Sequence, residues 1–243
     1  MKYSFFLFLS FLICSCSKSE IGTLSDLDPG TYPKESITID GIQREFSVYI
    51  PKNVPVNPTA IIGFHGLGGS KDTFPISSKF NVEADKHGFL LIYPSGLDQQ
   101  WSISPEKTVA DLKFTGALID LLIAKYNVNK KKIFAMGMSN GAYFSNQVGK
   151  AYAEKIAGIV VHSGTLGAEA ISGIVANRKF PVMIIHGIAD PLISINLARK
   201  SRDIYLKEKH NVEYYEFADL GHEWAHKYAI NDKIGAFFLK YSL

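Results

Sequence analysis

The feature that most constrains the fold is a regular alternation, from about residue 59 onward, of short apolar runs with longer amphipathic stretches. The apolar runs are too short for buried helices and are predicted strands: Thr59–Phe64, Phe89–Tyr93, Lys132–Met136, Ile156–His162, Pro181–His186 and Val212–Phe217. The stretches with helical periodicity are Ser77–His87, Lys107–Tyr126, Asn140–Lys150, Asn196–His210 and His226–Lys240. This alternation predicts an α/β fold, with a mostly parallel, twisted sheet that carries helices on both faces.

The beginning of the predicted domain follows a different pattern. Ser36–Ile39 and Arg44–Ile50 both alternate apolar and polar residues, and Asp40-Gly41 between them is a strong turn signal. An N-terminal antiparallel hairpin is therefore expected. The connection from His162 to Pro181 is too short for an inserted lid domain, so we expect an open cleft.

Composition indicates one domain and argues against nucleic acid as a partner. A chain of 243 residues with 47% hydrophobic content can bury one sizeable core. The formal net charge of +3 comes from 26 basic and 23 acidic residues that are scattered along the chain. No long basic run is present that could follow a phosphate backbone.

The N-terminus has the pattern of an export signal. Lys2 precedes an uncharged apolar run from Tyr3 to Cys14, which is too short to cross about 30 Å of hydrocarbon as a helix. Ile13–Cys16 resembles a bacterial lipobox, which predicts lipidation of Cys16, attachment to a membrane and the location of an outer-membrane lipoprotein facing the periplasm or the cell surface. The alternative is an ordinary secretory signal cleaved nearby. The expected organisation is a signal peptide over 1–16, a tether over 17–34 and one folded domain over 35–243.

Gly137–Gly141 has the pattern G-x-S-x-G with Ser139 at its centre. It follows a predicted strand and precedes a predicted helix, and this context is that of a nucleophile elbow. The tight turn exposes the serine hydroxyl above the sheet, at a helix N-terminus whose partial positive charge favours a developing anion. Ser139 is therefore the predicted nucleophile.

A serine hydroxyl is a weak nucleophile near neutral pH, so it needs an imidazole base and a carboxylate that orients the base. Asp190 lies in a turn directly after the predicted strand Pro181–His186. His222 lies after the last predicted strand and before the last helix. Their order after Ser139 is the order that this type of elbow requires, and we assign Asp190 and His222 to these roles.

The anion formed during attack on an ester needs backbone N–H donors that already point at it. One donor is expected from the amide of Asn140, the residue after the nucleophile. The other is expected from the glycine-rich loop His65–Gly69, with the amide of Leu67 as the best candidate.

A competing motif overlaps the predicted base. His222–His226 reads H-E-x-x-H, the zinc-binding pattern of many metalloprotease helices. A zinc hydrolase would need His222 and His226 on one helical face together with a third ligand. Gly221 and the preceding strand place His222 in a loop, which argues against a zinc site. Neither a metal nor an organic cofactor is expected.

The motifs together resemble a family of secreted esterases that includes polyhydroxybutyrate depolymerases and feruloyl and acetylxylan esterases. The resemblance covers most of residues 35–243 and rests on these segments: His65–Gly69, Tyr93–Gly96 with Trp101, Asp111–Phe114, Gly137–Gly141, His186–Pro191 and Gly221–Trp224. It implies the α/β-hydrolase fold and the triad of Ser139, Asp190 and His222. We also expect Trp101 and Trp224 to contact substrate. The family often has a cysteine where Leu67 stands and often has disulfides, and this chain has neither.

These observations predict a serine esterase that works through an acyl-enzyme on Ser139. Feruloyl or acetyl esters of plant polysaccharide are the first expected substrates, and hydroxyalkanoate oligomers or polymers are the second. A non-catalytic binding protein with this fold is the alternative of another class.

Overall fold

The computed structural model of the chain describes residue 24 and residues 27–167 and 174–243. The predicted signal peptide and Cys16 lie outside these residues and stay predictions. Within the described part of the chain, every helix is too short or too polar to span a bilayer.

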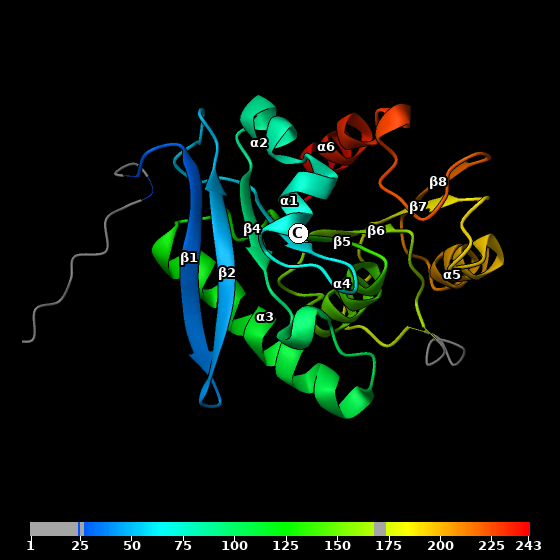
Figure 1. Cartoon of the computed structure of the whole chain (residues 1–243), viewed down its shortest axis with the longest axis horizontal. Coiled ribbons are helices and arrows are strands. Elements are labelled where there is room, and N and C mark those ends of the chain that lie inside the picture. The colour runs from blue at the N-terminus through cyan, green and yellow to red at the C-terminus, as the bar shows by residue number, and fades with distance from the viewer. Residues whose placement is uncertain (1–23, 25–26, 168–173) are drawn as a thin grey trace, which may run out of the picture.

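One eight-stranded sheet runs through the molecule in the order β1-β2-β4-β3-β5-β6-β7-β8 (Figure 1). The strands are β1 (Gly30–Ile39), β2 (Ile42–Ile50), β3 (Ala60–Phe64), β4 (Leu90–Pro94), β5 (Ile133–Met138), β6 (Gly158–His162), β7 (Val182–Gly187) and β8 (Val212–Phe217). Strand β2 is antiparallel to both β1 and β4, whereas β4, β3, β5, β6, β7 and β8 are mutually parallel. The predicted α/β fold with a mostly parallel sheet is confirmed.

The predicted N-terminal hairpin is also confirmed. Asp40 and Gly41 both have positive φ, 49° and 81°, as a two-residue turn between right-twisted strands requires. However, β1 begins at Gly30, inside the segment expected to be a tether. The register of β1 against β2 shifts between Tyr32 and Glu35, around Pro33, which cannot donate a ladder hydrogen bond. Residues 30–34 therefore belong to the sheet.

Helices cover both faces of the sheet (Figure 1). They are α1 (Thr73–Ser78), α2 (Asn81–His87), α3 (Pro105–Lys125), α4 (Asn140–Ala151), α5 (Ile195–Lys207) and α6 (Ile230–Lys240), with short 3-10 turns η2 (Leu97–Gln99) and η4 (His226–Tyr228). Helices α1, α2 and α6 lie on one face, and α3, α4 and α5 lie on the other. Each layer buries its own apolar cluster against the sheet, so strands β3 to β7 are apolar on both sides.

Two predicted helices are interrupted in the structure. The stretch Ser77–His87 was expected to be one helix, but the chain divides at Lys79, which has a φ of 51° and ends α1. The stretch His226–Lys240 divides at Ala229, with a φ of 49°, between η4 and α6. Apolar periodicity continues through both breaks, which is why the sequence pattern did not reveal them.

Candidate active site

Ser139 occupies a sharp turn between β5 and α4. Its φ of 56° and ψ of −118° lie outside the regions that residues with a Cβ normally adopt. The turn is tight because a Cβ on Gly137 would collide with the carbonyl of Gly141, and one on Gly141 would collide with the carbonyls of Phe64 and His65. Ser139 remains partly exposed to solvent. The local geometry is that of the predicted nucleophile elbow.

Asp190 and His222 meet at the carboxyl ends of β7 and β8. The distance between Asp190 Oδ2 and His222 Nδ1 is 2.8 Å, and the Asp190 side chain is fully buried. Burial alone would raise the pKa of Asp190, but hydrogen bonds from Ile193 N, His222 and Leu192 N outweigh it and hold that pKa below its usual value. An ionised carboxylate only accepts hydrogen bonds, so His222 Nδ1 carries the proton and Nε2 is left as an acceptor.

The loops that carry Asp190 and His222 are joined through their backbones. Ile188 N donates to Phe217 O at 2.8 Å, and Ala189 N donates to Leu220 O at 3.1 Å. A Cβ on Gly187 would collide with Leu220 O, so the two loops pack without an intervening side chain. The carboxylate and the imidazole are thereby fixed relative to one another.

His162, the last residue of β6, links this pair to the nucleophile turn. Its carbonyl accepts a hydrogen bond from Ser139 N at 2.9 Å, and its ring Nε2 accepts one from Ala225 N at 3.1 Å. The ring is fully buried and stacks on Trp224 with a centroid separation of 4.6 Å. Desolvation by burial, with smaller contributions from neighbouring histidines, lowers the pKa of His162 to about 3. An imidazole that is neutral near pH 7 therefore lies between the serine turn and the histidine loop.

The glycine-rich loop after β3 lies beside Ser139. A Cβ placed on Gly66 would be 3.5 Å from the Ser139 Cβ, and the side chain of Leu67 is 71% exposed. Gly68 has a φ of 76° and donates its N–H to Gln99 O at 2.8 Å. The structure thus brings the loop carrying Leu67 next to the turn carrying Asn140.

His65 fixes the start of this loop. Its ring Nδ1 is 2.7 Å from Gly66 O, and its Nε2 accepts a hydrogen bond from Gly96 N at 3.0 Å. These partners require the neutral tautomer with the proton on Nδ1. Burial lowers the pKa of His65, which agrees with that state.

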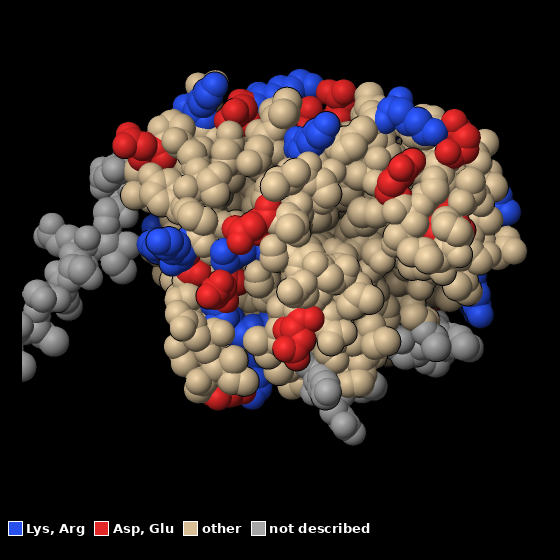
Figure 2. Space-filling model, viewed as in Figure 1, with Lys and Arg blue, Asp and Glu red and all other residues tan. Residues whose placement is uncertain are grey.

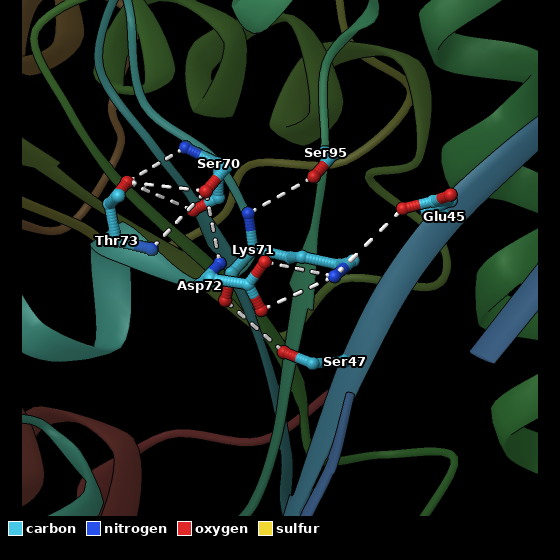
Figure 3. A network of polar contacts seen from close by, with 7 residues as sticks. All are labelled: Glu45, Ser47, Ser70, Lys71, Asp72, Thr73 and Ser95. Atoms are coloured by element: carbon cyan, nitrogen blue, oxygen red, sulfur yellow. Dashed lines mark hydrogen bonds and ion pairs between the residues drawn. The ribbon is translucent and has the colours of Figure 1, made fainter. Parts of the chain in front are cut away.

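A polar network holds the other end of the loop (Figure 3). Lys71 N donates to Ser95 Oγ at 3.1 Å, and Ser47 Oγ donates to Lys71 O at 3.2 Å. The Lys71 ammonium reaches Asp72 at 3.0 Å, while Ser70 and Thr73 exchange backbone and side-chain hydrogen bonds at the start of α1. Residues 65–73 are therefore tied to β2 and to the segment after β4.

Both tryptophans that were expected to contact substrate are buried instead. Trp101 is 1% exposed, and its ring stacks on Phe144 at a centroid separation of 4.9 Å. Trp224 is 6% exposed, stacks on His162, and donates its indole N–H to Asn231 Oδ1 at 2.8 Å. The prediction that they line the cleft is wrong, because packing beneath the site takes up both rings.

The H-E-x-x-H pattern does not form a metal-binding helix. His222 lies in a loop and its Nδ1 is bonded to Asp190, whereas His226 is the first residue of η4. His226 Nε2 is 2.8 Å from Ser77 O on α1. Among the described residues, no group of three or more histidine, cysteine, aspartate or glutamate side chains is arranged to hold a metal ion.

His210 also departs from expectation. It was expected to end the helix Asn196–His210, but it follows α5 and is buried against Phe180 and Tyr205. His210 Nδ1 is 2.9 Å from Phe180 O, just before β7 begins, whereas Asp190 follows the end of β7. The two residues therefore lie at opposite edges of the sheet.

A cleft of about 450 Å³ lies along the segment that joins β4 to α3. Its lining combines exposed apolar side chains with hydroxyl, amide and carboxylate groups: Leu97, Asp98, Gln100, Ser102, Ile103, Ser104, Ala110 and Asp111. Asp111 is paired with the buried Arg44 at 2.8 Å, which neutralises it. On the face shown in Figure 2, acidic and basic side chains are interspersed, with broad areas that carry neither.

The fold and the arrangement of Ser139, Asp190 and His222 at the carboxyl edge of the sheet define the class, an α/β hydrolase. A model of the phospholipase/carboxylesterase family matches residues 104–229, slightly more than half of the chain. The chain belongs to this family. The predicted α/β-hydrolase fold is confirmed, as is the resemblance to a family of esterases with this fold.

Individual relatives are more distant. A bifunctional acetylxylan esterase/xylanase from Neocallimastix patriciarum is 27% identical over 63% of this chain and 22% of its own length. Feruloyl esterase B from Neurospora crassa is 27% identical over 49% of this chain and 44% of its own length. The chain thus spans less than half the length of either relative. An acetyl xylan esterase structure from Aspergillus awamori shares the fold with a TM-score of 0.68 and 16% identity, covering 84% of this chain and 98% of that one.

Proposed function

We propose that this protein is a serine esterase in which Ser139, His222 and Asp190 form the catalytic triad. The observation that carries the proposal is the 2.8 Å contact between His222 and a buried, ionised Asp190, on loops tied through His162 to the strained turn at Ser139. This contact leaves His222 Nε2 as the only ring nitrogen able to accept a proton.

The reaction has two acyl-transfer steps. Ser139 Oγ attacks the ester carbonyl carbon while His222 Nε2 takes the hydroxyl proton, and the carbonyl oxygen becomes an anion. The amides of Leu67 and Asn140 bind that anion. When the intermediate collapses, the proton on His222 passes to the departing alcohol. A water molecule then gives a proton to His222 and attacks the acyl carbon. When this second intermediate collapses, His222 returns the proton to Ser139 Oγ, and the acid leaves.

The cleft along residues 97–111 supports a neutral substrate with a hydroxyl-rich leaving group. Gln100 and Ser102, the two sequence neighbours of Trp101, line this cleft. The Trp101 backbone N–H donates to the side chain of Asn140, the residue after the nucleophile, and so connects the cleft to the candidate site. Amide and hydroxyl side chains recognise sugar hydroxyls, while the exposed Leu97 and Ile103 suit the apolar face of a sugar or an acyl group. Acetyl or feruloyl esters on carbohydrate are therefore the first substrates that we propose, and hydroxyalkanoate oligomers are the second candidates.

Hydrolysis of p-nitrophenyl acetate by the wild type and by Ser139→Ala tests the nucleophile. We expect the substitution to reduce kcat by about 10⁴-fold or more, and a chelator to have no effect on the wild type. Activity that survives the substitution would falsify the assignment, and activity abolished by chelation would restore the zinc alternative. Comparing kcat/KM for acetylated xylo-oligosaccharides, feruloylated oligosaccharides and hydroxybutyrate oligomers then ranks the substrates.

A further inference from the structure

The two proposed oxyanion donors come from separate loops. Leu67 follows β3, and Asn140 is the first residue of α4, where a helix amide has no intrahelical partner. Backbone donors stabilise an oxyanion only when both already point at one position, since reorienting them during the reaction would forfeit most of the gain. Some contact must therefore fix the distance between the two loops.

Trp101 makes contacts to both loops. Its backbone N–H donates to Asn140 Oδ1 at 2.7 Å, and its backbone carbonyl accepts from Asn140 Nδ2 at 2.8 Å. This reciprocal pair fixes the orientation of the residue after the nucleophile. Its indole Nε1 donates to the carbonyl of His65, two residues before Leu67, at 3.0 Å.

The indole cannot readily leave this position. Phe144 stacks on it with an interplanar angle of 8°, and Phe64 contacts it edge-on at 5.0 Å. Burial strengthens its hydrogen bond to His65, because no water can replace either partner. The His65 carbonyl, and with it the peptide leading to Gly66, is held against the first turn of α4.

We propose that Trp101 is the positioning residue of the oxyanion hole, holding the Leu67 and Asn140 amides in register through its indole N–H and its backbone. This inference rests on the proposed serine esterase function. Because the Trp101 side chain is 1% exposed, we expect it to act through the two amides in the transition state, and so to affect kcat rather than KM.

Trp101→Phe tests this proposal because it keeps an aromatic ring between Phe64 and Phe144 but removes the indole N–H. We expect kcat for p-nitrophenyl acetate to fall by about 10-fold, less than the 10² to 10³ lost with an entire donor, and KM to change by less than about threefold. The Ki of phenylboronic acid, whose tetrahedral adduct with Ser139 mimics the transition state, should rise by a similar factor.

Tyr205→Phe is the matched control. It also removes one buried aromatic hydrogen-bond donor, since Tyr205 OH donates to Asn146 Oδ1 on α4 at 2.7 Å. Tyr205 lies near His210, at the opposite edge of the sheet from the candidate site. We expect it to lower the melting temperature as Trp101→Phe does while kcat and the boronate Ki stay within twofold of the wild type. A second variant, Asn140→Ala, removes the two hydrogen bonds between the Asn140 side chain and the Trp101 backbone but keeps the backbone N–H of residue 140. It should also lower kcat, even if Trp101→Phe folds poorly.

The outcomes are distinct. If Trp101→Phe and Asn140→Ala keep wild-type kcat and boronate affinity, or change them no more than Tyr205→Phe does, the positioning role is overturned. Ser139→Ala in the same assays separates this result from failure of the proposed function, because a serine esterase loses turnover in that variant whether or not Trp101 positions the oxyanion hole.

Discussion

The two buried tryptophans support opposite sides of the candidate site by different means. On the side of the proposed oxyanion hole, called the oxyanion side below, Trp101 joins three separate segments of the chain through hydrogen bonds to His65 and Asn140. On the base side, the N–H of Trp224 bonds only to Asn231, seven residues away, and its ring stacks on His162.

The difference follows from what each side must hold. The direction of a backbone N–H is set by the conformation of its loop, so the geometry of the oxyanion side depends on hydrogen bonds between loops. The base side holds side chains, and its geometry depends on an ionised carboxylate and on an imidazole that stays neutral. Variants should therefore affect turnover on the first side through alignment and on the second through protonation.

Asp190→Asn should have the largest effect and acts on the base side alone. An amide can present an N–H to His222 Nδ1 and so favour the tautomer that leaves Nε2 unable to accept a proton. We expect kcat to fall by about 10³- to 10⁴-fold with little change in KM. The loss is measured with p-nitrophenyl acetate, and a loss below tenfold would show that Asp190 does not orient the base.

His162→Gln should change how stability responds to acid. Because the pKa of His162 is about 3 in the folded protein and near 6.5 when unfolded, only the unfolded chain binds this proton between those values. Stability therefore rises with pH up to about 6.5 and is lost below it, by about 1.4 kcal/mol per pH unit from this group.

Urea unfolding at pH 5 and pH 7 measures this dependence. In the glutamine variant, the free energy of unfolding should change less between these two pH values, by the amount that binding one proton contributes. The buried His65 and His210, whose pKa values are also lowered, contribute equally in both proteins. An unchanged slope would contradict the neutral state of His162.

Trp224→Phe provides the sharpest contrast with Trp101→Phe. The substitution keeps a ring against His162 and removes the hydrogen bond to Asn231, which costs about 1 kcal/mol of unfolding free energy. We expect kcat to change by less than threefold, because this hydrogen bond joins the loop of Trp224 to the first turn of α6 and reaches neither Ser139 nor the loop of Leu67. A loss of kcat as large as that of Trp101→Phe would remove the distinction between the two sides.

Glu223→Gln should have the smallest effect. Glu223 is exposed beside His222, and a zinc hydrolase would need it as the base acting on metal-bound water. In a serine esterase the same change leaves kcat within about twofold. A large loss of activity would point to the zinc alternative.

Much of the fold was predictable because buried parallel strands leave continuous apolar runs in the sequence. The boundaries that were missed have local causes. Pro33 obscured the early start of β1, and the left-handed conformation of Lys79 ended a helix within an unbroken apolar pattern.

In the site, the positions of Ser139, Asp190 and His222 followed from motifs placed directly after strands. The buried roles of Trp101 and Trp224 did not, because burial in a loop depends on which distant segments cover it. The indole of Trp101 reaches His65, and its backbone reaches Asn140, across sequence separations that no local pattern reports.

The backbone of Ser139 has a thermodynamic consequence of its own. A φ of 56° with a ψ of −118° costs a residue bearing a Cβ about 1–3 kcal/mol, and glycine largely avoids this cost. At this position glycine should therefore give a more stable protein than alanine does, although neither has a hydroxyl. Optimising this protein for thermal stability alone would select against the residue on which turnover is proposed to depend.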